Sequence, residues 1–401
     1  MGLLGDLLDP AFLEDPYPTY ARLLTTGPVM WDDEHRMWLV SGHPEFLEAL
    51  KRPETSVATA AARIRPALDE RAAHFEPLIG AVSRFLTRVD PPDHTRLRAL
   101  VQKAFTLSAV ERMHDDIASL VDGYLSPLPQ AGRMDVMSTL AVPLPITVIA
   151  RMLGVPEEDQ SRIKKWSDDL GSVADNDPGS EVLERAQESL GQMREYIVDV
   201  IARLTRKPGD DLLSALIKVE ESGDRLSHDE LFGIVQVMLI AGQETTTNLL
   251  GNGLHALLAH PDQLQRLRDK PDLWAGAIEE CLRYDSPVQS RTRVVTADIE
   301  LGGQRIAAGQ TLFLLVGAAN RDPRAFLDPD RFDITRTHNH HVAFGHGIHY
   351  CLGNALARLE ARIALGSVIA RMPRLALSPT APPQRQPNFS LRGFTSLWVT
   401  F

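Results

Sequence analysis

The chain has 401 residues and a mass of 44.4 kDa, which allows one large domain or a few smaller ones with a sizeable hydrophobic core. A composition of 44% hydrophobic and 24% charged residues excludes a largely disordered or fibrous protein. The 42 basic and 53 acidic residues give a net charge of −11, so we expect neither nucleic acid nor a membrane as a partner.

The cysteine content and the apolar stretches bear on where the protein works. Cys281 and Cys351 are too few for a disulfide framework and are typical of a reducing compartment. The N-terminus has no basic run before an apolar segment, so a signal peptide is not expected. The longest apolar stretches, 231–242 and 311–319, are shorter than the ~18 residues that a membrane-spanning helix needs. We therefore expect a cytoplasmic protein without a membrane anchor.

Helical periodicity dominates the chain, and neither a repeat nor a polar linker marks a domain boundary. The sequence therefore predicts a single domain over residues 1–401, mainly α with small peripheral β-sheets. Strand-like patterns are short and occur near the two ends, at residues 37–40, 293–296, 299–301, 311–316 and 397–401.

One long helix is predicted in the second half of the chain. Ser227 and Glu230 form a capping-box pattern, and the helix should run to about His260, a length of about 50 Å. Residues 231–240 are apolar on almost all sides, which predicts burial. Small and polar residues then follow at 242–247, and we expect the helical hydrogen-bond ladder to open there.

The strongest local signal is the glycine-rich segment 344–353, with the sequence FGHGIHYCLG, which is followed directly by a helical pattern. Cys351 therefore lies at the start of a helix, where exposed N–H groups and the helix dipole favour the thiolate that binds metals. Gly345, Gly347 and Gly353 would let the backbone approach a flat ligand closely.

Two other interpretations of this segment stay open on the residues alone. One is a buried structural cysteine in a glycine-rich turn. The other is a zinc site that uses the nearby histidines, although the usual paired-cysteine and paired-histidine patterns are missing from the sequence. The histidines concerned are His338, His340, His341, His346 and His349.

The same segment resembles the heme-binding signature of the cytochromes P450, the heme-thiolate monooxygenases. That signature runs Phe, two residues, Gly, one residue, Arg or His, one residue, Cys, one residue, Gly, and the matching positions here are Phe344, Gly347, His349, Cys351 and Gly353. The resemblance implies that Cys351 is the axial iron ligand of heme b (iron protoporphyrin IX) and that Phe344 contacts this cofactor. Thiolate ligation favours cleavage of the O–O bond.

The polar part of the long helix, residues 241–246, resembles the oxygen-binding stretch of the same family. The resemblance implies that Ala241 and Gly242 leave room for dioxygen over the heme. Glu244 would relay protons and Thr245 would present its hydroxyl to the oxygen, which is a general acid–base arrangement. Without the cysteine segment, a packing kink would explain these residues equally well.

Further residues match the positions that hold the heme propionates in the family. His94 and Arg98 lie four residues apart on one helix face and would otherwise be ordinary solvated residues. The resemblance implies that both, together with Arg293 and His349, bind the two propionates. Four donors would offset the large cost of burying two carboxylates.

Glu280 and Arg283 lie three residues apart on a helix, and by themselves indicate a surface ion pair. They also match the family's Glu-x-x-Arg motif, and residues 328–332 resemble the segment whose arginine, here Arg331, completes the same network. We assign these three residues to structure around the cysteine loop. Cys281 is expected to be a small buried hydrophobic residue.

The resemblance covers nearly the whole chain, from residues 15–18 to the turn at Arg392. It implies a monooxygenase that inserts one oxygen atom of O2 into a hydrophobic small organic molecule. The sequence contains no fused redox domain, so a separate ferredoxin and ferredoxin reductase would supply the electrons. A peroxide-driven peroxygenase and a non-catalytic heme-thiolate sensor remain alternatives, but the acid–alcohol pair Glu244 and Thr245 favours the dioxygen route. Two residues, Asn354 and Phe394, depart from the family pattern.

Two surfaces follow from the resemblance. A local basic patch would steer the acidic ferredoxin, formed by Arg98, Lys103, Arg358 and Arg362. The substrate pocket would draw on residues 56–88 and 166–193 and on Val237, Ile240, Ala241, Val288, Gln289 and Phe394. These single residues are uncharged and mainly apolar, which suits a terpene, polyketide, steroid or fatty acid.

Overall fold

The computed structural model describes residues 3–5, 9–58, 72–127, 132–172, 179–221 and 224–401. The chain forms two compact units. Unit 1 comprises Met1–Ser56, Met113–Leu144 and Thr245–Phe401, and unit 2 comprises Val57–Arg112 and Pro145–Glu244. The structure is mainly α with small sheets, so the predicted fold class is confirmed. That residues 1–401 act as one domain stays a prediction.

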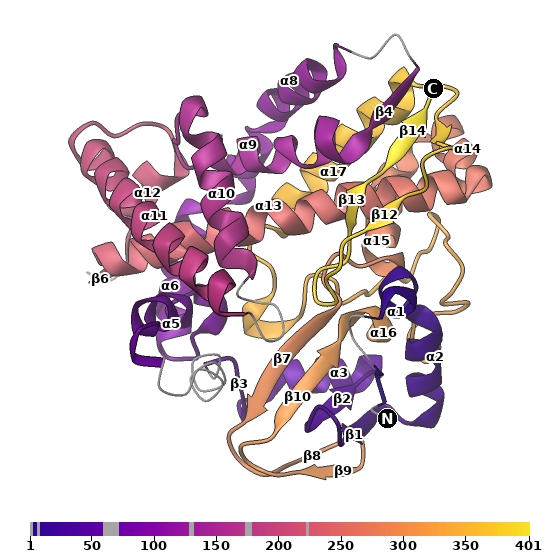
Figure 1. Cartoon of the computed structure of the whole chain (residues 1–401), viewed down its shortest axis with the longest axis horizontal. Coiled ribbons are helices and arrows are strands. Elements are labelled where there is room, and N and C mark those ends of the chain that lie inside the picture. The colour runs from indigo at the N-terminus through magenta and orange to yellow at the C-terminus, as the bar shows by residue number, and fades with distance from the viewer. Residues whose placement is uncertain (1–2, 6–8, 59–71, 128–131, 173–178, 222–223) are drawn as a thin grey trace. The chain divides into compact units, whose positions relative to one another are not determined.

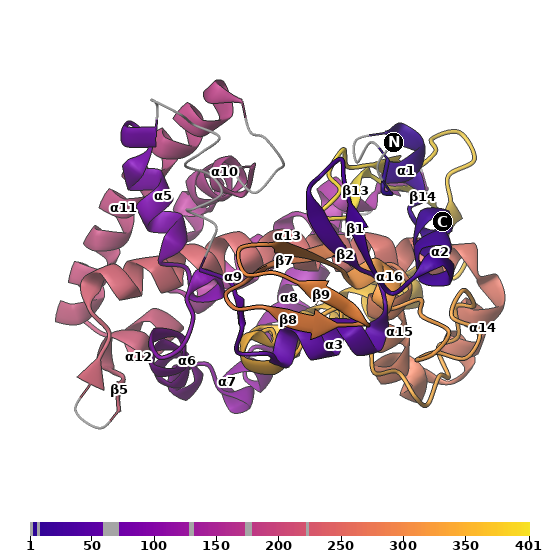
Figure 2. The same ribbon diagram turned by 90° about the horizontal axis from the view of Figure 1, so that it is seen from below.

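Unit 1 contains a five-stranded sheet, in which β2 and β10 are parallel and the other neighbours antiparallel. Helix α3 (His43–Lys51) packs its buried side chains, such as Phe46, into the same hydrophobic cluster as Leu312 and Leu314 of this sheet. The strand order is β1 (Val29–Asp32), β2 (Met37–Val40), β10 (Thr311–Leu315), β7 (Ser290–Val295) and β3 (Thr55–Ser56). Helix α3 also lies beside β8, as Figure 2 shows.

The remaining strands of unit 1 are two or three residues long. They form a sheet of order β11 (Ala376–Leu377), β14 (Trp398–Thr400) and β4 (Arg133–Asp135), and the pairs β8 (Ile299–Leu301) with β9 (Gln304–Ile306) and β12 (Gln384–Arg385) with β13 (Phe394–Ser396). All five predicted strand patterns fall on strands. The strands that the sequence did not reveal are too short, at two to four residues, for an alternating pattern to show.

Among the helices of unit 1, α17 follows the cysteine loop and packs against α8 and α15 (Figure 1). They are α1 (Pro10–Glu14), α2 (Tyr17–Thr26), α3, α8 (His114–Leu125), the π-helical turn Met137–Ala141, α14 (Pro261–Asp269), α15 (Trp274–Tyr284), α16 (Val316–Ala319) and α17 (Asn354–Arg371). Contact with two other helices fixes the direction in which the start of α17 points.

Unit 2 is mostly helical, and its helices α10 and α11 lie side by side (Figure 1). The Trp166 indole on α10 donates to Gln192 on α11 at 2.9 Å. The helices and hairpin of this unit are α5 (Glu76–Ser83), α6 (Asp93–Ala104), α7 (Leu107–Glu111), α10 (Gln160–Gly171), α11 (Ser180–Arg206), α12 (Leu212–Lys218), and β5 (Glu220–Glu221) with β6 (Asp224–Arg225). Helix α9 (Pro143–Met152) has residues in both units.

The predicted long helix is α13 (His228–Ala259). Its capping box is present, because the Glu230 N–H donates to Ser227 Oγ at 3.2 Å and the Ser227 N–H donates to Glu230 Oε2 at 2.8 Å. The prediction that the helix opens at 242–247 is wrong, since α13 is α-helical throughout. The Thr247 hydroxyl donates to the Ala141 carbonyl at 2.9 Å and so links α13 to a neighbouring segment. Of the helices that the described residues form, none has the length and apolarity needed to cross a membrane.

Candidate active site

The segment around Cys351 is a tight loop that ends at the start of α17. Gly345 and Gly347 have φ values of +73° and +70°, a left-handed backbone that strains any residue with a Cβ. A Cβ at Gly347 would also lie 3.1 Å from the Leu50 carbonyl oxygen on α3. The resulting turn lets the Cys351 N–H donate to the Phe344 carbonyl at 3.0 Å. These two glycines therefore set the direction of the cysteine.

The chemistry of Cys351 matches that of a metal ligand. The side chain forms no disulfide and is partly exposed. It lies two residues before Gly353, which caps α17, so the exposed N–H groups of that helix favour a thiolate. Cys281, by contrast, is only 1% exposed, and burial raises the pKa of its thiol, as expected for a structural cysteine. The loop thus carries one partly exposed cysteine sulfur outside any disulfide.

The four predicted propionate ligands come from both units. In unit 1, Arg293 on β7 is 8% exposed, and His349 ends the short helical turn Gly347–His349. In unit 2, His94 and Arg98 lie one turn apart on α6, and His94 is 2% exposed. Burial, followed by the positive charge of Arg98, lowers the pKa of His94. At neutral pH His94 would therefore offer a hydrogen bond rather than a positive charge.

Helix α13 is mostly buried but keeps one accessible stripe. In its middle part the partly or fully exposed residues 237, 240, 241, 244 and 245 are spaced by three or four positions, which places them on one face. The neighbours of this stripe, such as Gln236 and Leu239, are buried. The stripe contains the predicted proton-relay residues and two predicted substrate contacts, namely Val237, Ile240, Ala241, Glu244 and Thr245.

Glu280 and Arg283 form a buried ion pair with no exposed side-chain surface, not the surface pair that their spacing alone indicates. The Arg283 guanidinium donates to both carboxylate oxygens of Glu280 at 2.8 Å each. It also donates to three backbone carbonyl oxygens, those of Asn320 at 2.9 Å, Pro329 at 2.7 Å and Arg331 at 3.0 Å. The pair therefore anchors the backbone at Asn320 and the loop at 329–331 to α15.

The role predicted for Arg331 is wrong in one respect. Its side chain is exposed, and only its carbonyl takes part in the network. The guanidinium that completes the network belongs to Arg336, which donates to Glu280 at 3.3 Å and to the Leu327 carbonyl at 2.6 Å. Asn339 adds a hydrogen bond to Glu280 at 3.1 Å. A sequence motif could not separate the two arginines, because the choice depends on how the loop folds back.

Glu279, next to Glu280 on α15, is a site residue that the sequence did not reveal. It accepts two hydrogen bonds from Arg358, at 2.6 and 2.8 Å, and one from His341 at 3.1 Å. Burial alone would raise the pKa of Glu279, but these hydrogen bonds lower it to about 2. Because Glu279 compensates its charge, Arg358 is not the free docking cation that the sequence predicted.

Two of the predicted substrate contacts are wrong. The Gln289 side chain is 1% exposed, accepts a hydrogen bond from the Tyr20 hydroxyl at 3.0 Å and donates one to the Ser286 carbonyl at 2.8 Å. Phe394 is 2% exposed, and the guanidinium carbon of Arg385 lies 3.8 Å from its ring centroid. Neither side chain therefore offers surface to a ligand.

The other predicted contacts differ in their exposure. Val288 is buried and forms a β-bridge with Leu391, whereas Val237 and Ile240 lie on the accessible stripe of α13. Of the predicted pocket stretches, residues 59–71 and 173–178 lie outside the described residues.

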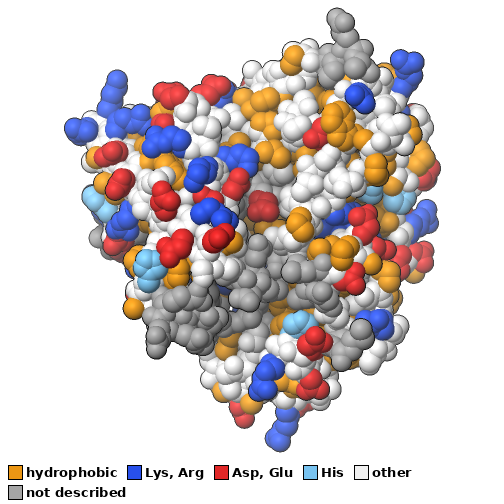
Figure 3. Space-filling view, in the orientation of Figure 1, with side chains coloured by type: hydrophobic (Ala, Val, Ile, Leu, Met, Phe, Trp, Pro, Cys, Tyr) orange, Lys and Arg blue, Asp and Glu red, His pale blue; other side chains and the backbone are white. Residues whose placement is uncertain are grey.

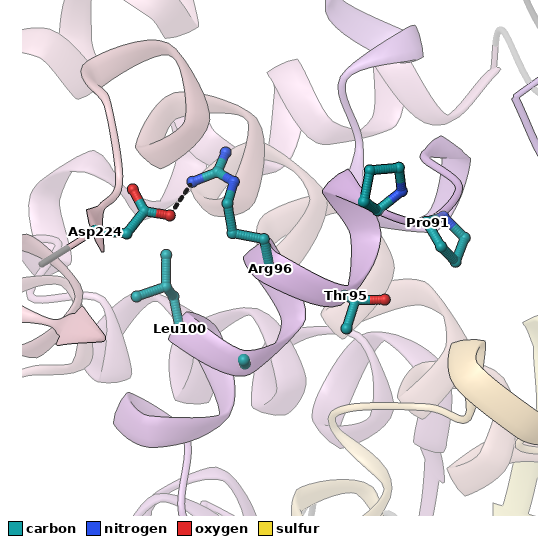
Figure 4. A pocket seen from close by; sticks show the side chains of 7 residues that line it. Pro91, Thr95, Arg96, Leu100 and Asp224 are labelled. Atoms are coloured by element: carbon teal, nitrogen blue, oxygen red, sulfur yellow. Dashed lines mark hydrogen bonds and ion pairs between the residues drawn. The ribbon is translucent and has the colours of Figure 1, made fainter. Parts of the chain in front are cut away.

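Unit 2 has a surface hollow of about 780 Å³ whose lining includes none of the predicted site residues (Figure 4). In it Arg96 pairs with Asp224 at 3.0 Å and with Glu230. Its lining consists of Pro91, Pro92, Thr95, Arg96, Ala99, Leu100 and Asp224. None of these residues was predicted to bind cofactor or substrate.

Comparison with known proteins identifies the family. The cytochrome P450 family model matches residues 82–395. The cytochrome P450 monooxygenase PikC of Streptomyces venezuelae is 42% identical over 99% of this chain and 92% of its own length, and the vitamin D(3) 25-hydroxylase of Pseudonocardia autotrophica is 40% identical over 93% and 90%. The solved structure of P450BioI in complex with hexadec-9Z-enoic acid ligated acyl carrier protein has a TM-score of 0.90 and 38% identity, and covers 98% of this chain and 100% of that one.

The chain therefore belongs to the cytochrome P450 family. It is a monooxygenase that hydroxylates small organic molecules with a heme-thiolate cofactor, which confirms the predicted reaction class. For the zinc alternative, the described residues contain no cluster of three or more histidine, cysteine or acidic side chains that could hold a metal ion. His341 instead binds Glu279, as described above.

The two arginines near Glu280 give a direct test of the buried network. Arg336→Ala should lower the free energy of unfolding by about 2–3 kcal/mol, because it removes hydrogen bonds to a buried carboxylate and to backbone carbonyls. Arg331→Ala should change it by less than about 0.5 kcal/mol, since only the Arg331 backbone takes part. Denaturant unfolding followed by circular dichroism measures both values, and equal losses would contradict the assignment.

Proposed function

We propose that Cys351 provides the axial thiolate of heme b, and that the chain uses this cofactor to insert one oxygen atom of O2 into a hydrophobic small molecule. The observation that carries the proposal is the glycine-shaped loop that presents a partly exposed cysteine, outside any disulfide, just before α17. A cysteine sulfur outside any disulfide, together with histidine and arginine side chains, is the donor set that a heme with two propionates requires. The residues present therefore fit this cofactor.

In this proposal Arg293, His349, His94 and Arg98 bind the propionates, and Phe344 contacts the porphyrin. Arg293 and Arg98 supply positive charge, while His94, whose pKa is lowered by burial, supplies a hydrogen bond. The heme, when bound, supplies the one-electron and dioxygen chemistry that amino-acid side chains lack.

Helix α13 would deliver the protons of the reaction. Glu244 and Thr245 lie on its accessible stripe together with Ala241, which is exposed and small, whereas Gly242 faces the Ile149 side chain. The Thr245 hydroxyl can donate a hydrogen bond at this face, and the Glu244 carboxyl can return a proton to it from solvent. This pair favours the dioxygen route over a peroxygenase, and also over a sensor, which needs no proton relay.

The substrate should be a hydrophobic molecule such as a terpene, polyketide, steroid or fatty acid. Val237 and Ile240 give the accessible stripe of α13 an apolar end. The relatives named above differ in substrate, since one is a vitamin D(3) hydroxylase and another was solved with a fatty acyl carrier protein. The family match therefore does not select one substrate class.

We further propose that the protein works in the cytoplasm as one catalytic domain over residues 1–401, with a ferredoxin and a ferredoxin reductase as electron donors. Lys103 on α6 and Arg362 on α17 are exposed and suit an acidic carrier. On the face shown in Figure 3, basic and acidic side chains alternate over α10 and α11, which indicates no single-sign patch there. Lys164 and Lys165 on α10 each pair with an aspartate four residues on.

Cys351→Ala tests the axial assignment. The reduced, carbon-monoxide-bound wild-type protein should show the strongly red-shifted Soret band of thiolate ligation, and the variant should lose it because no sulfur remains in the loop. Cys281→Ala is the matched control and should keep the band. A band that survives in Cys351→Ala would contradict the assignment.

Thr245→Ala tests the proton relay. The variant should still consume reductant and dioxygen, but most of the electrons should appear as hydrogen peroxide instead of product, because the hydroxyl that guides protonation is gone. Thr247→Val is the control, since its hydroxyl is bound to the Ala141 carbonyl. The ratio of product to reductant consumed measures the effect, and unchanged coupling in Thr245→Ala would reject the relay.

Charge reversal tests the docking residues. Lys103→Glu and Arg362→Glu should each slow reduction by ferredoxin at low salt and weaken its dependence on ionic strength. Lys165→Glu on α10 should leave both unchanged. Stopped-flow reduction measures these rates, and wild-type values for the first two variants would show that the carrier binds elsewhere.

A further inference from the structure

A continuous chain of hydrogen bonds leads from α15 to the backbone of Cys351. Glu279 on α15 holds the Arg358 guanidinium through two hydrogen bonds, at 2.6 and 2.8 Å. Arg358 donates to Asn354 Oδ1 at 2.6 Å, and Asn354 Nδ2 donates to the Cys351 carbonyl at 2.7 Å. One amide side chain therefore joins a fixed arginine to the residue that carries the sulfur.

The far end of this chain is fixed by His341, whose side chain is 3% exposed. The Ala343 N–H donates to Nδ1 of His341 at 3.2 Å, so Nδ1 is an acceptor and the ring proton lies on Nε2. That proton is donated to Glu279 Oε2 at 3.1 Å. Glu279 thus has hydrogen-bond partners on both carboxylate oxygens. The Arg358 guanidinium likewise has partners on both sides, Glu279 on one and Asn354 on the other.

Arg358 also reaches the loop by a second route. Its guanidinium carbon lies 4.5 Å from the centroid of the Phe344 ring, and the Phe344 carbonyl accepts the Cys351 N–H at 3.0 Å. The N–H and the C=O of Cys351 are therefore both held by residues that contact Arg358. Hydrogen bonding raises the pKa of Arg358, which keeps it charged in this position.

We propose that Glu279, Arg358 and Asn354 are positioning residues that keep the Cys351 thiolate directed at the heme iron. This inference rests on the proposed axial role of Cys351. Outer partners of a metal ligand set its orientation and its affinity for the metal. The proposal also gives a reason for Asn354, because a smaller side chain at this position could not reach both Cys351 and Arg358.

The alternative role for Arg358 is that of a charge, either for docking a carrier or for stabilising the thiolate through space. The two roles differ in sign. Arg358→Gln removes a positive charge and Glu279→Gln removes a negative one, so a purely electrostatic effect moves any heme property in opposite directions. Loss of a hydrogen-bonded link moves it in the same direction in both variants.

The experiment uses the heme-loaded enzyme and follows the thiolate Soret band of the reduced carbon-monoxide complex during mild heating, with circular dichroism recorded in parallel. Asn354→Ala, Arg358→Gln and Glu279→Gln should each lose the band roughly tenfold faster than the wild type, while the helical signal is unchanged. Arg358→Lys keeps the positive charge but not the planar guanidinium that binds two partners at once, and it should behave like Arg358→Gln. Arg362→Gln, one turn further on α17 and exposed, should match the wild type.

Each other outcome overturns the proposal. Opposite changes in Arg358→Gln and Glu279→Gln would show a field effect, and a wild-type rate in Arg358→Lys would show that charge alone matters. Band loss that coincides with loss of helical signal would show a general role in folding. A stable band in Asn354→Ala, Arg358→Gln and Glu279→Gln, with the band lost in Cys351→Ala, would reject the link but keep the axial assignment. A wild-type protein without the band would reject both.

Discussion

The direction of one cysteine side chain is the constraint on which this structure depends. A thiolate can bind iron only if its loop turns it toward the metal, and in the proposed site two glycines with a left-handed backbone shape the loop of Cys351. The loop ends where α17 begins. The N-terminus of this helix therefore favours a negatively charged sulfur and also anchors the end of the loop. The proposed substrate contacts and proton-relay residues on α13 would act only once the cofactor is held in this way.

Two adjacent glutamates on α15 support the loop in different ways. Successive residues of a helix point about 100° apart, so Glu280 and Glu279 face different neighbours. Glu280 is buried and holds Arg283, which fixes the Asn320 carbonyl, while the Asn320 side chain accepts the Val342 N–H just before the loop. Glu279 holds Arg358 on α17 instead. A buried ion pair is costly, and the backbone carbonyls bound to Arg283 offset part of that cost.

The features that the sequence predicted are those with local causes. The capping box of α13 involves residues three apart, and the loop of Cys351 depends on glycines within ten positions. Arg336, Asn339 and the burial of Gln289 could not be predicted, because their partners lie far away in the sequence and depend on how loops pack. The polar run on α13 was misinterpreted as a helix opening, since a threonine hydroxyl can bond to another segment as well as to its own helix.

Iron-edge X-ray absorption on the purified ferric protein tests the central claim most directly, because it identifies the atoms bound to the metal without any assumption about activity. The account predicts one sulfur neighbour in addition to the porphyrin nitrogens, and the loss of that sulfur when Cys351 is replaced. A wild-type iron centre surrounded only by nitrogen and oxygen would contradict it.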